Sequence, residues 1–352
     1  MDLDLSLDGG ALTASLVDIA SVSGDEGALA AAIEEALRGL SHLSVHTDGN
    51  AVVARTSLGR SERVVLAGHI DTVPVADNLP SHVDGGRLYG CGATDMKSGL
   101  AVQLRLAARA VEPCRDVTYV FYDCEEIQAE RNGLLRLSRH HPEWLAADFA
   151  VLMEPTDGVV EGGCQGTLRA DVRVPGERAH SARSWIGRNA IHASARVLEV
   201  LNSYLTRQPE VDGLVYREGL NAVNIAGGVA ANVIPDSCVI TVNYRFAPDR
   251  TVGEAAKHVR GIFAGWDVEV TDAAGGARPG LDRAPAAAFL AAVGGTARAK
   301  LGWTDVARFA ALGIPAVNYG PGIPKIAHTQ GEYVELAQIP ECEARMLAWL
   351  AS

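Results

Sequence analysis

The sequence contains, at residues 64–74, the segment Val64-Val65-Leu66-Ala67-Gly68-His69-Ile70-Asp71-Thr72-Val73-Pro74. Its small and apolar first half predicts a buried strand, and Pro74 ends the pairing. His69 and Asp71 are two residues apart, so on a strand their side chains point to the same face. An imidazole beside a carboxylate at a strand end is typical of a metal site, where one group binds and the other orients it. A half-exposed ion pair that caps the strand is the alternative.

The composition is that of a globular protein with room for two domains. The chain has 352 residues, of which 48% are hydrophobic and 21% charged, which is ordinary for a globular fold. The net charge of -12 argues against a nucleic-acid-binding surface. If the substrate is an anionic small molecule, local arginines or lysines must therefore overcome a repulsive overall field.

Nothing in the sequence points to a membrane or to an oxidising compartment. The N-terminal residues are acidic and lack a signal-peptide pattern, and no apolar run approaches the roughly 18 residues of a membrane span. The six cysteines are scattered without a CxxC pair: Cys91, Cys114, Cys124, Cys164, Cys238 and Cys342. This pattern favours reduced thiols, and we expect a cytoplasmic protein.

Three predicted strands, at 64–70, 117–122 and 149–153, each end in residues that can act chemically. The second is followed by Glu125 and Glu126, and the third by Glu154. Predicted helices separate the strands, an alternation that indicates a largely parallel α/β sheet. Because the carboxyl ends of parallel strands converge, we expect these carboxylates to meet His69. Each strand end taken singly could be a solvated cap, but together the carboxylates would repel one another unless a cation lies between them.

The remaining elements of this first part follow from local patterns. Apolar periodicity predicts helices at 11–20 and 27–40, and Ser23-Gly24-Asp25-Glu26 resembles a capping box before the second. Asp84-Gly85-Gly86 predicts a hairpin turn. Further elements are predicted as a helix ending near 111, a helix at 284–293, strands at 296–300 and 314–319, and a helix at 336–350.

The character of the chain changes near residue 166. The order that follows is a strand at 168–174, a helix at 187–207, strands at 220–226 and 237–246, a helix at 252–264 and a strand at 266–271. This β-α-β-β-α-β order is the ferredoxin-like arrangement. We therefore expect a catalytic domain formed by 1–166 and 281–352, with a ferredoxin-like α+β domain, 167–280, inserted into it.

The chemistry-bearing residues form one candidate set: His69, Asp71, Asp95, Glu125, Glu126, Glu154 and His328. Nitrogen and oxygen ligands without thiolate suit Zn²⁺, Co²⁺ or Mn²⁺. The set exceeds one tetrahedral site and suits two metals that share a carboxylate. Glu125 and Glu126 are adjacent, which favours one as ligand and the other as general base. The expected reaction is hydrolysis, in which metals generate hydroxide and polarise a carbonyl while a glutamate moves the proton.

These motifs resemble those of the dizinc M20 peptidase and deacylase family over nearly the whole chain. The resemblance is carried by 68–74, Gly92-Ala93-Thr94-Asp95-Met96-Lys97-Ser98-Gly99, Glu125-Glu126 and Glu154-Pro155. It implies a zinc-peptidase-like mixed sheet flanked by helices, with the inserted domain serving dimerisation. Within the family, the segments 122–126, 163–167, 179–185 and 302–309 are most similar to the actinobacterial type of succinyl-diaminopimelate desuccinylase.

The resemblance assigns a role to each residue of the candidate set. His69 and Glu154 would bind one zinc ion, Glu126 and His328 the second, and Asp95 would bridge the two. Cobalt can substitute for zinc in such sites. Asp71 would orient His69, Glu125 would be the general base, and the peptide bond after Asp95 would be cis.

The resemblance also implies a homodimer that completes the active site. His180 would reach from the inserted domain into the partner subunit's site and stabilise the oxyanion, and Asn232 would contact substrate across the same interface. Taken locally, a histidine in a loop is usually only solvated, and the turn at Asn232 has nothing else to mark it.

The implied substrate is N-succinyl-LL-2,6-diaminopimelate, which carries three carboxylates and is cleaved to succinate and LL-2,6-diaminopimelate. Arginines hold carboxylates efficiently by paired hydrogen bonds. The candidate substrate-binding residues are Arg183, Asn232, Arg245, Arg308 and Gly322. Other branches carry basic residues at Cys164-Gln165, so Arg183 is a candidate replacement here. N-acetylornithine, another N-acyl amino acid or a small peptide remains an alternative substrate, and a metal-free binding protein is an alternative of another class.

Overall fold

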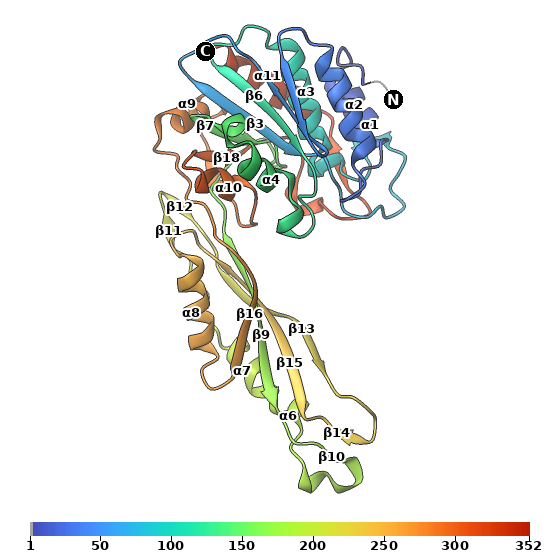
Figure 1. The fold of residues 1–352 in the computed structure, drawn as a ribbon, viewed down its shortest axis with the longest axis vertical. Coiled ribbons are helices and arrows are strands. Elements are labelled where there is room, and N and C mark those ends of the chain that lie inside the picture. The colour runs from blue at the N-terminus through green and yellow to red at the C-terminus, as the bar shows by residue number, and fades with distance from the viewer. Residues whose placement is uncertain (1–2) are drawn as a thin grey trace. The chain divides into compact units, whose positions relative to one another are not determined.

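The computed structural model describes residues 3–352 and divides into two compact units (Figure 1). The first comprises the described residues up to Gly162 together with Pro279–Arg298 and Arg308–Ser352. The second comprises Gly163–Arg278 and Ala299–Ala307. The division differs from the expected one at three short segments. The second unit, and not the first, contains residues 163–166 and 299–307, whereas residues 279–280 belong to the first unit.

The first unit is built on an eight-stranded mixed sheet with the order β1-β2-β6-β3-β7-β18-β8-β17. Its four inner strands, β6, β3, β7 and β18, are parallel to one another, whereas β1, β2 and β8 pair antiparallel at the edges. The bounds are β1 Ser44–Asp48, β2 Ala51–Arg55, β3 Arg63–His69, β6 Asp116–Tyr122, β7 Phe149–Leu152, β8 Val160–Gly162, β17 Ala297–Ala299 and β18 Ala316–Asn318. The expected mixed α/β sheet is confirmed.

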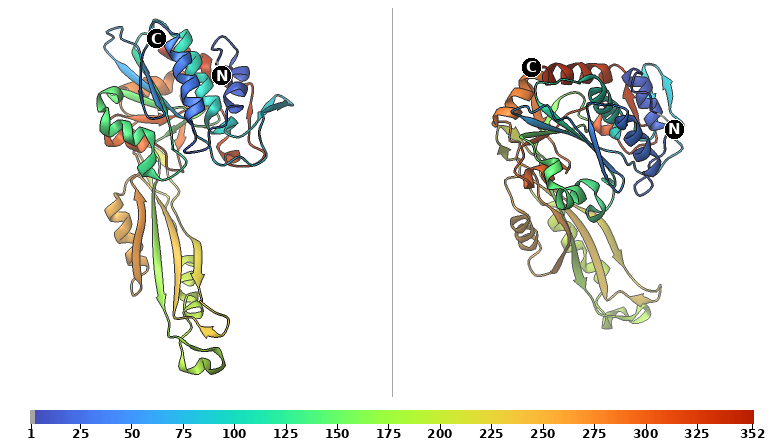
Figure 2. Two further views of the ribbon diagram at one scale, coloured as in Figure 1. Left: turned by 45° about the vertical axis from the view of Figure 1, so that its right-hand side comes forward. Right: turned by 45° about the horizontal axis from the view of Figure 1, so that its top comes forward.

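Helices flank this sheet, as two rotated views show (Figure 2). Val64 and Leu66 of β3 belong to one buried cluster with apolar residues of α1, α2, α3, α9 and α11, so this strand is covered by helices on that face. The helices of the unit are α1 Gly9–Val17, α2 Gly27–Arg38, α3 Ser98–Arg109, α4 Gly133–His140, α5 Pro142–Leu145, α9 Ala284–Val293, α10 Val306–Ala311 and α11 Gln338–Leu350. Burial of every β3 residue after Arg63 explains why the strand is almost wholly apolar.

A small antiparallel sheet accompanies the large one. The predicted turn at 84–86 connects β4 His82–Asp84 to β5 Arg87–Tyr89, and β5 also pairs with β19 Tyr333–Glu335. This pairing places the segment before β19 next to the loop that follows β5.

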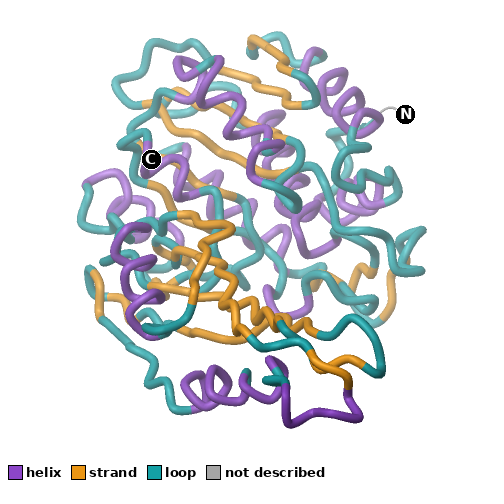
Figure 3. The backbone as a smooth tube through the Cα atoms, turned by 60° about the horizontal axis from the view of Figure 1, so that its bottom comes forward, coloured by secondary structure: helices purple, strands orange, loops and turns teal. Residues whose placement is uncertain are grey.

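The second unit has a four-stranded antiparallel sheet in the order β13-β15-β9-β16. The order along the chain is β9 Gly166–Pro175, α6 Ala190–Ala193, α7 Ala195–Asn202, β13 Gly219–Gly227, β15 Ser237–Phe246, α8 Val252–Ile262 and β16 Asp267–Ala274. Taken in chain order, these strands lie in the sequence 4-1-3-2 across the sheet, which is the ferredoxin-like arrangement. Figure 3 distinguishes these strands from the helices of the unit.

One helix of this unit is shorter than expected. The sequence predicted a helix over 187–207, but the structure has α6 and α7 over 190–202, with Asn189 accepting the His192 N–H at the helix start. The apolar face continues beyond Asn202, but the chain leaves the helix there. Short elements complete the unit: β10 Ala179–His180, β11 Glu210–Val211, β12 Leu214–Val215 and β14 Val233–Ile234.

Among the described residues, no helix combines the length and the apolar character needed to span a bilayer.

Candidate metal centre

The register of the parallel strands brings three chemical groups to one edge of the sheet. His69 is the last residue of β3 and pairs with Tyr122 at the end of β6, while Ala67 pairs with Leu152 at the end of β7. The residues that follow these strand ends, Glu125 and Glu154 among them, therefore emerge beside His69. This is the convergence that the sequence pattern predicted.

Two groups of potential ligands lie at this edge and share one carboxylate. His69, Asp95 and Glu154 form one group, and Asp95, Glu126 and His328 form the other. Within each group the ligand atoms all lie within 4.8 Å of one another. Glu125 also lies within that distance of His69 and Glu126. The structure thus brings together the five predicted ligands and the predicted base.

The two oxygens of Asp95 face different histidines. Oδ1 lies 3.2 Å from Nε2 of His69, and Oδ2 lies 3.4 Å from Nε2 of His328. His328 Nε2 is also 2.7 Å from Oε1 of Glu126. A carboxylate placed in this way offers one oxygen to each of the two ligand groups.

The electrostatics of the cluster favour positive charge. Burial opposes protonation of His69, yet Asp71 and Asp95 raise its pKa well above the ordinary value. Hydrogen bonds to Asp95 and Glu126 raise the pKa of His328 to about 10. The neighbouring carboxylates therefore favour positive charge at this site, which a divalent cation would supply. Nitrogen and oxygen donors in this number fit Zn²⁺ or Co²⁺.

His69 is oriented mainly by the main chain of Asp71. Its Nδ1 lies 3.0 Å from the Asp71 carbonyl oxygen and 3.5 Å from Oδ1 of the same residue. Donation from Nδ1 leaves Nε2 directed at the ligand cluster, as is usual for metal-binding histidines.

Asp95 lies in a tight turn that a buried carboxylate holds in place. The Asp95–Met96 peptide bond is cis, as the resemblance implied. Glu332, which is 2% exposed, accepts the N–H groups of Gly92, Thr94 and Asp95 at 3.1, 2.9 and 2.9 Å. Sequence analysis missed Glu332, because no local pattern marks a residue that reaches a turn more than 230 positions away.

The predicted capping box at 23–26 is wrong. Ser23 does not cap α2; its hydroxyl donates to Oδ2 of Asp71 at 2.6 Å. The carboxylate of Glu26 accepts the N–H of Gly24 at 2.7 Å. The tertiary contact with Asp71 has replaced the local hydrogen bond, so this segment supports the metal centre instead of starting a helix with its serine.

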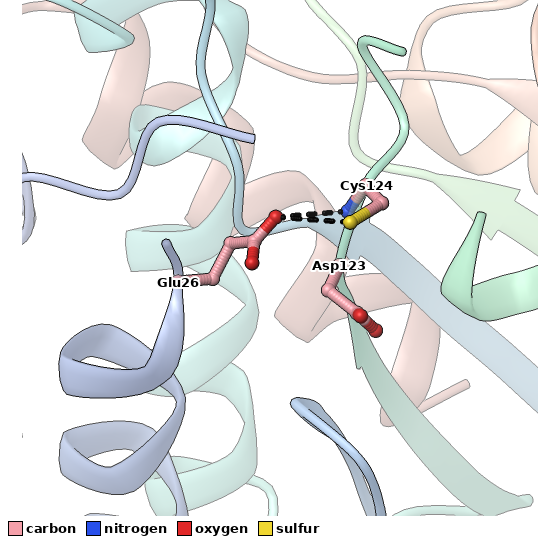
Figure 4. Close-up of side chains that lie close together, drawn as sticks. All are labelled: Glu26, Asp123 and Cys124. Carbon is pink, nitrogen blue, oxygen red and sulfur yellow. Dashed lines mark hydrogen bonds between the residues drawn. The ribbon is translucent and has the colours of Figure 1, made fainter. Parts of the chain in front are cut away.

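A second acidic group, formed by Glu26, Asp123 and Cys124, anchors the turn that carries Glu125 (Figure 4). Cys124 has a positive φ of 58°, and Oε1 of Glu26 accepts both its N–H and its thiol hydrogen at 3.3 Å. Asp123 is paired with Arg136 at 2.6 Å. Since an arginine compensates Asp123 and Glu26 is occupied by donors, this group is structural.

The other predicted site residues lie apart from this cluster in the sequence and occupy several elements. His180 ends β10 and pairs with Val233, and the Ser181 N–H donates to the Asn232 carbonyl at 2.9 Å, so the structure places His180 beside Asn232. Both are exposed, as is Arg183 in the turn that follows. Arg245 lies on β15.

Two predicted substrate residues belong to the first unit. Arg308 lies in α10. Gly322 has a φ of +95°, and a Cβ there would lie 2.8 Å from Oγ1 of Thr94, the neighbour of Asp95. Only glycine combines that backbone conformation with such close approach to the Asp95 turn.

Comparison with known proteins identifies the family. The family model described as Peptidase family M20/M25/M40 matches residues 65–352. The chain belongs to this family. Its donor set and its family together imply that the protein depends on a metal ion.

Several known proteins are similar to this M20 family member over almost its whole length. It is 58% identical over 340 residues to the DapE protein of Mycobacterium tuberculosis (strain CDC 1551 / Oshkosh), covering 96% of each; that protein is named provisionally as a succinyl-diaminopimelate desuccinylase. The present chain is 48% identical to the succinyl-diaminopimelate desuccinylase of Corynebacterium glutamicum. The match covers 99% of this chain and 98% of that protein. A Staphylococcus aureus tripeptidase structure shares the fold, with a TM-score of 0.82, 22% identity and coverage of 100% and 99%.

Proposed function

We propose that this protein hydrolyses N-succinyl-LL-2,6-diaminopimelate to succinate and LL-2,6-diaminopimelate, a step of lysine and diaminopimelate biosynthesis. The full-length similarity to a desuccinylase at 48% identity carries the choice of substrate. The two ligand groups around Asp95 carry the choice of reaction, because hydrolysis of an unactivated amide needs an electrophile and a basic group side by side.

The metal centre would hold two zinc ions, for which cobalt can substitute. His69 and Glu154 would serve one, Glu126 and His328 the other, and Asp95 both. Bound there, the metals would lower the pKa of water and polarise the scissile carbonyl. The opposed oxygens of Asp95 support this assignment, since each faces a histidine of a different group.

Glu125 would be the general base. It lies within 4.8 Å of the ligand atoms of His69 and Glu126, and its backbone is held by Asp71. From that position its carboxylate takes a proton from the attacking water and returns it to the departing amine. Attack by water forms the new C–O bond first, and the amide C–N bond then breaks. The hydroxyl of the water stays with succinate, and the proton leaves with the amine.

Substrate binding would depend on the second unit and on a second copy of the chain. We propose a homodimer in which His180 stabilises the oxyanion in the partner subunit's site and Asn232 contacts the substrate beside it. Their adjacency through the β10–β14 pairing supports a joint role. Arg183, Arg245 and Arg308 would hold carboxylates, and Gly322 would offer its main chain. The scattered cysteines favour a cytoplasmic location.

Steady-state hydrolysis of N-succinyl-LL-2,6-diaminopimelate by the zinc-loaded protein tests the proposal, with N-acetylornithine as the comparison. We expect kcat/KM to favour the succinyl substrate by at least about a hundredfold, which corresponds to roughly 2.7 kcal/mol of transition-state discrimination. Activity on N-acetylornithine alone would overturn the substrate but keep the chemistry. Zinc-loaded protein without activity on these compounds or on a panel of acyl amino acids and peptides would overturn both.

A further inference from the structure

Three side chains of the first unit converge beside β1, the first strand in the order of the large sheet. Asp48 is the last residue of β1, His140 ends α4, and His141 follows it before α5. Oδ2 of Asp48 lies 3.1 Å from Nδ1 of His140 and 3.5 Å from Nε2 of His141. One carboxylate oxygen therefore faces two imidazole nitrogens, and none of these residues belongs to the ligand groups around Asp95.

The two separations match those of ligand atoms that share one metal ion. Two ligand atoms about 2 Å from a tetrahedral ion lie roughly 3.3 Å apart, and the separations at Oδ2 of Asp48 fall on either side of that value. The remaining separation, between the two imidazoles, is adjustable, because the His140 side chain is 59% exposed at the end of its helix. Rotation of this exposed ring can therefore complete the set.

Asp48 is held in an orientation that leaves Oδ2 to the histidines. Nε of Arg136 donates to Oδ1 at 3.1 Å, and Nη2 of Arg136 donates to the main-chain carbonyl of Asp48 at 2.8 Å. Arg136 also pairs with Asp123 at 2.6 Å, so one guanidinium serves two carboxylates. Burial opposes ionisation of Asp48, but the hydrogen bond from His140 and the charge of Arg136 lower its pKa. Asp48 is thus an ionised and oriented group whose charge Arg136 compensates only in part.

His141 has the surroundings of a metal-binding histidine. While its Nε2 faces Asp48, its Nδ1 lies 3.6 Å from Oε1 of Glu143. A carboxylate at the second ring nitrogen usually orients a histidine ligand and makes it more basic. The ring is also held flat against the indole of Trp144, with ring centroids 3.8 Å apart and planes inclined by 5°. A ring that is already oriented loses less entropy when it binds an ion.

We propose that Asp48, His140 and His141 form a binding site for a divalent transition-metal ion of the zinc type, separate from the catalytic centre. Two imidazoles and one carboxylate suit Zn²⁺, Ni²⁺ or Cu²⁺, whereas Ca²⁺ and Mg²⁺ prefer oxygen ligands. Three protein ligands leave a fourth position for water. The site does not depend on the proposed hydrolytic function.

Calorimetric titration of the zinc-loaded protein with further Zn²⁺ tests the site. After gel filtration has removed loosely held metal, we expect the wild-type protein to bind one additional equivalent. His140→Gln and His141→Gln should each weaken that binding by at least about tenfold, since even the loss of a group behind a ligand costs that much. His82→Gln is the matched control and should bind as the wild type does, because His82 is also exposed and stacked on an aromatic ring, that of Tyr89, but lies on β4.

Fluorescence shows where the additional ion binds. Because Cu²⁺ quenches an indole close to it, Cu²⁺ at this site should quench Trp144, which lies against His141. We expect Trp144→Phe to lose that quenching and still to bind the additional zinc, since a phenyl ring can also stack on His141. The site would be refuted by wild-type protein that binds no additional zinc, by unchanged binding in both histidine variants, or by quenching that persists in full in Trp144→Phe. None of these measurements is of enzyme activity, so this proposal and the proposed function can fail separately.

Discussion

The carboxylate of Asp71 holds the backbone of Glu125, whose N–H donates to Oδ1 at 2.9 Å. The other oxygen accepts the N–H of Glu126 at 3.0 Å and the hydroxyl of Ser23 at 2.6 Å. Burial opposes ionisation of Asp71, but its contacts with His69, Ser23 and Glu126 lower its pKa below the ordinary value. The buried carboxylate of Asp71 therefore fixes the backbone of both Glu125, the proposed base, and Glu126, a proposed ligand. The same carboxylate also lies next to His69.

Replacing that charge tests its supporting role. In Asp71→Asn, an amide nitrogen would face a backbone N–H, so the turn at 125–126 should shift. We expect zinc affinity to fall by about tenfold to a hundredfold, as is usual when a group behind a metal ligand is lost, and kcat to fall with it. Chelator competition measures the affinity. Ser23→Ala keeps both backbone hydrogen bonds and should have a smaller effect; unchanged affinity in Asp71→Asn would contradict the assignment.

Glu125→Gln separates the base from the ligands. Since the amide cannot take a proton from water, kcat should fall by roughly two to four orders of magnitude, while metal content stays at the wild-type level. Glu130→Gln, an exposed change in the nearby 129–131 turn, is the matched control and should be silent. A Glu125→Gln protein with ordinary kcat and full metal content would rule out Glu125 as the base.

Metal content distinguishes shared from separate ligands. We expect wild-type protein to retain two equivalents of zinc after gel filtration, and Glu154→Gln and His328→Ala each to retain about one, since they belong to different groups. Asp95→Asn should weaken both sites. Elemental analysis checks the three variants. Two tightly held zinc ions in Asp95→Asn would show that this carboxylate is not the bridge.

The role proposed for His180 predicts complementation between inactive subunits. Mixing Glu125→Gln with His180→Ala protein should restore up to about a quarter of wild-type activity, because about half of reassorted dimers are mixed and each has one complete site. Subunit exchange is verified with tagged chains. Exchange without recovered activity would mean that His180 acts within its own chain or not at all.

Asp116 provides a pH-dependent test of stability away from the metals. Its carboxylate accepts the N–H groups of Leu58 and Arg60 at 2.8 and 3.0 Å and the hydroxyl of Thr56 at 2.8 Å. Burial opposes ionisation, but these contacts and Arg63 lower the pKa of Asp116 in the folded protein. The stabilisation is therefore present above the unfolded pKa and is lost as pH falls through the lower folded pKa.

Asp116→Asn should accordingly cost about 1.5–3 kcal/mol near neutral pH. The difference from wild type should shrink as the pH falls below about 4, the ordinary pKa of an aspartate. Urea unfolding of the metal-loaded protein at several pH values measures it. Asp84→Asn, in the exposed hairpin strand β4, is the control. A difference that is constant over the whole pH range would contradict an ionic contribution.

Patterns local to the chain were enough to predict most elements and most of the side chains that gather in the candidate site. Runs of apolar residues predict the buried strands. The parallel order of β6, β3 and β7 follows from the helices that connect them along the chain. Once those strands are parallel, His69 and the carboxylates after β6 and β7 must emerge at the same edge. His328 stood in the candidate set, but no local pattern marks it as a ligand, and only the family resemblance gave it that role.

What the local pattern could not contain is the partner of each polar group. Ser23 has the composition of a helix cap but bonds Asp71, 48 positions away, and Glu332 holds the Asp95 turn across 237 positions. Residue type and spacing determined which groups are present and on which strand ends they lie. Long-range packing decided which group each of them meets, because a hydrogen bond depends on distance in space and not on separation along the chain.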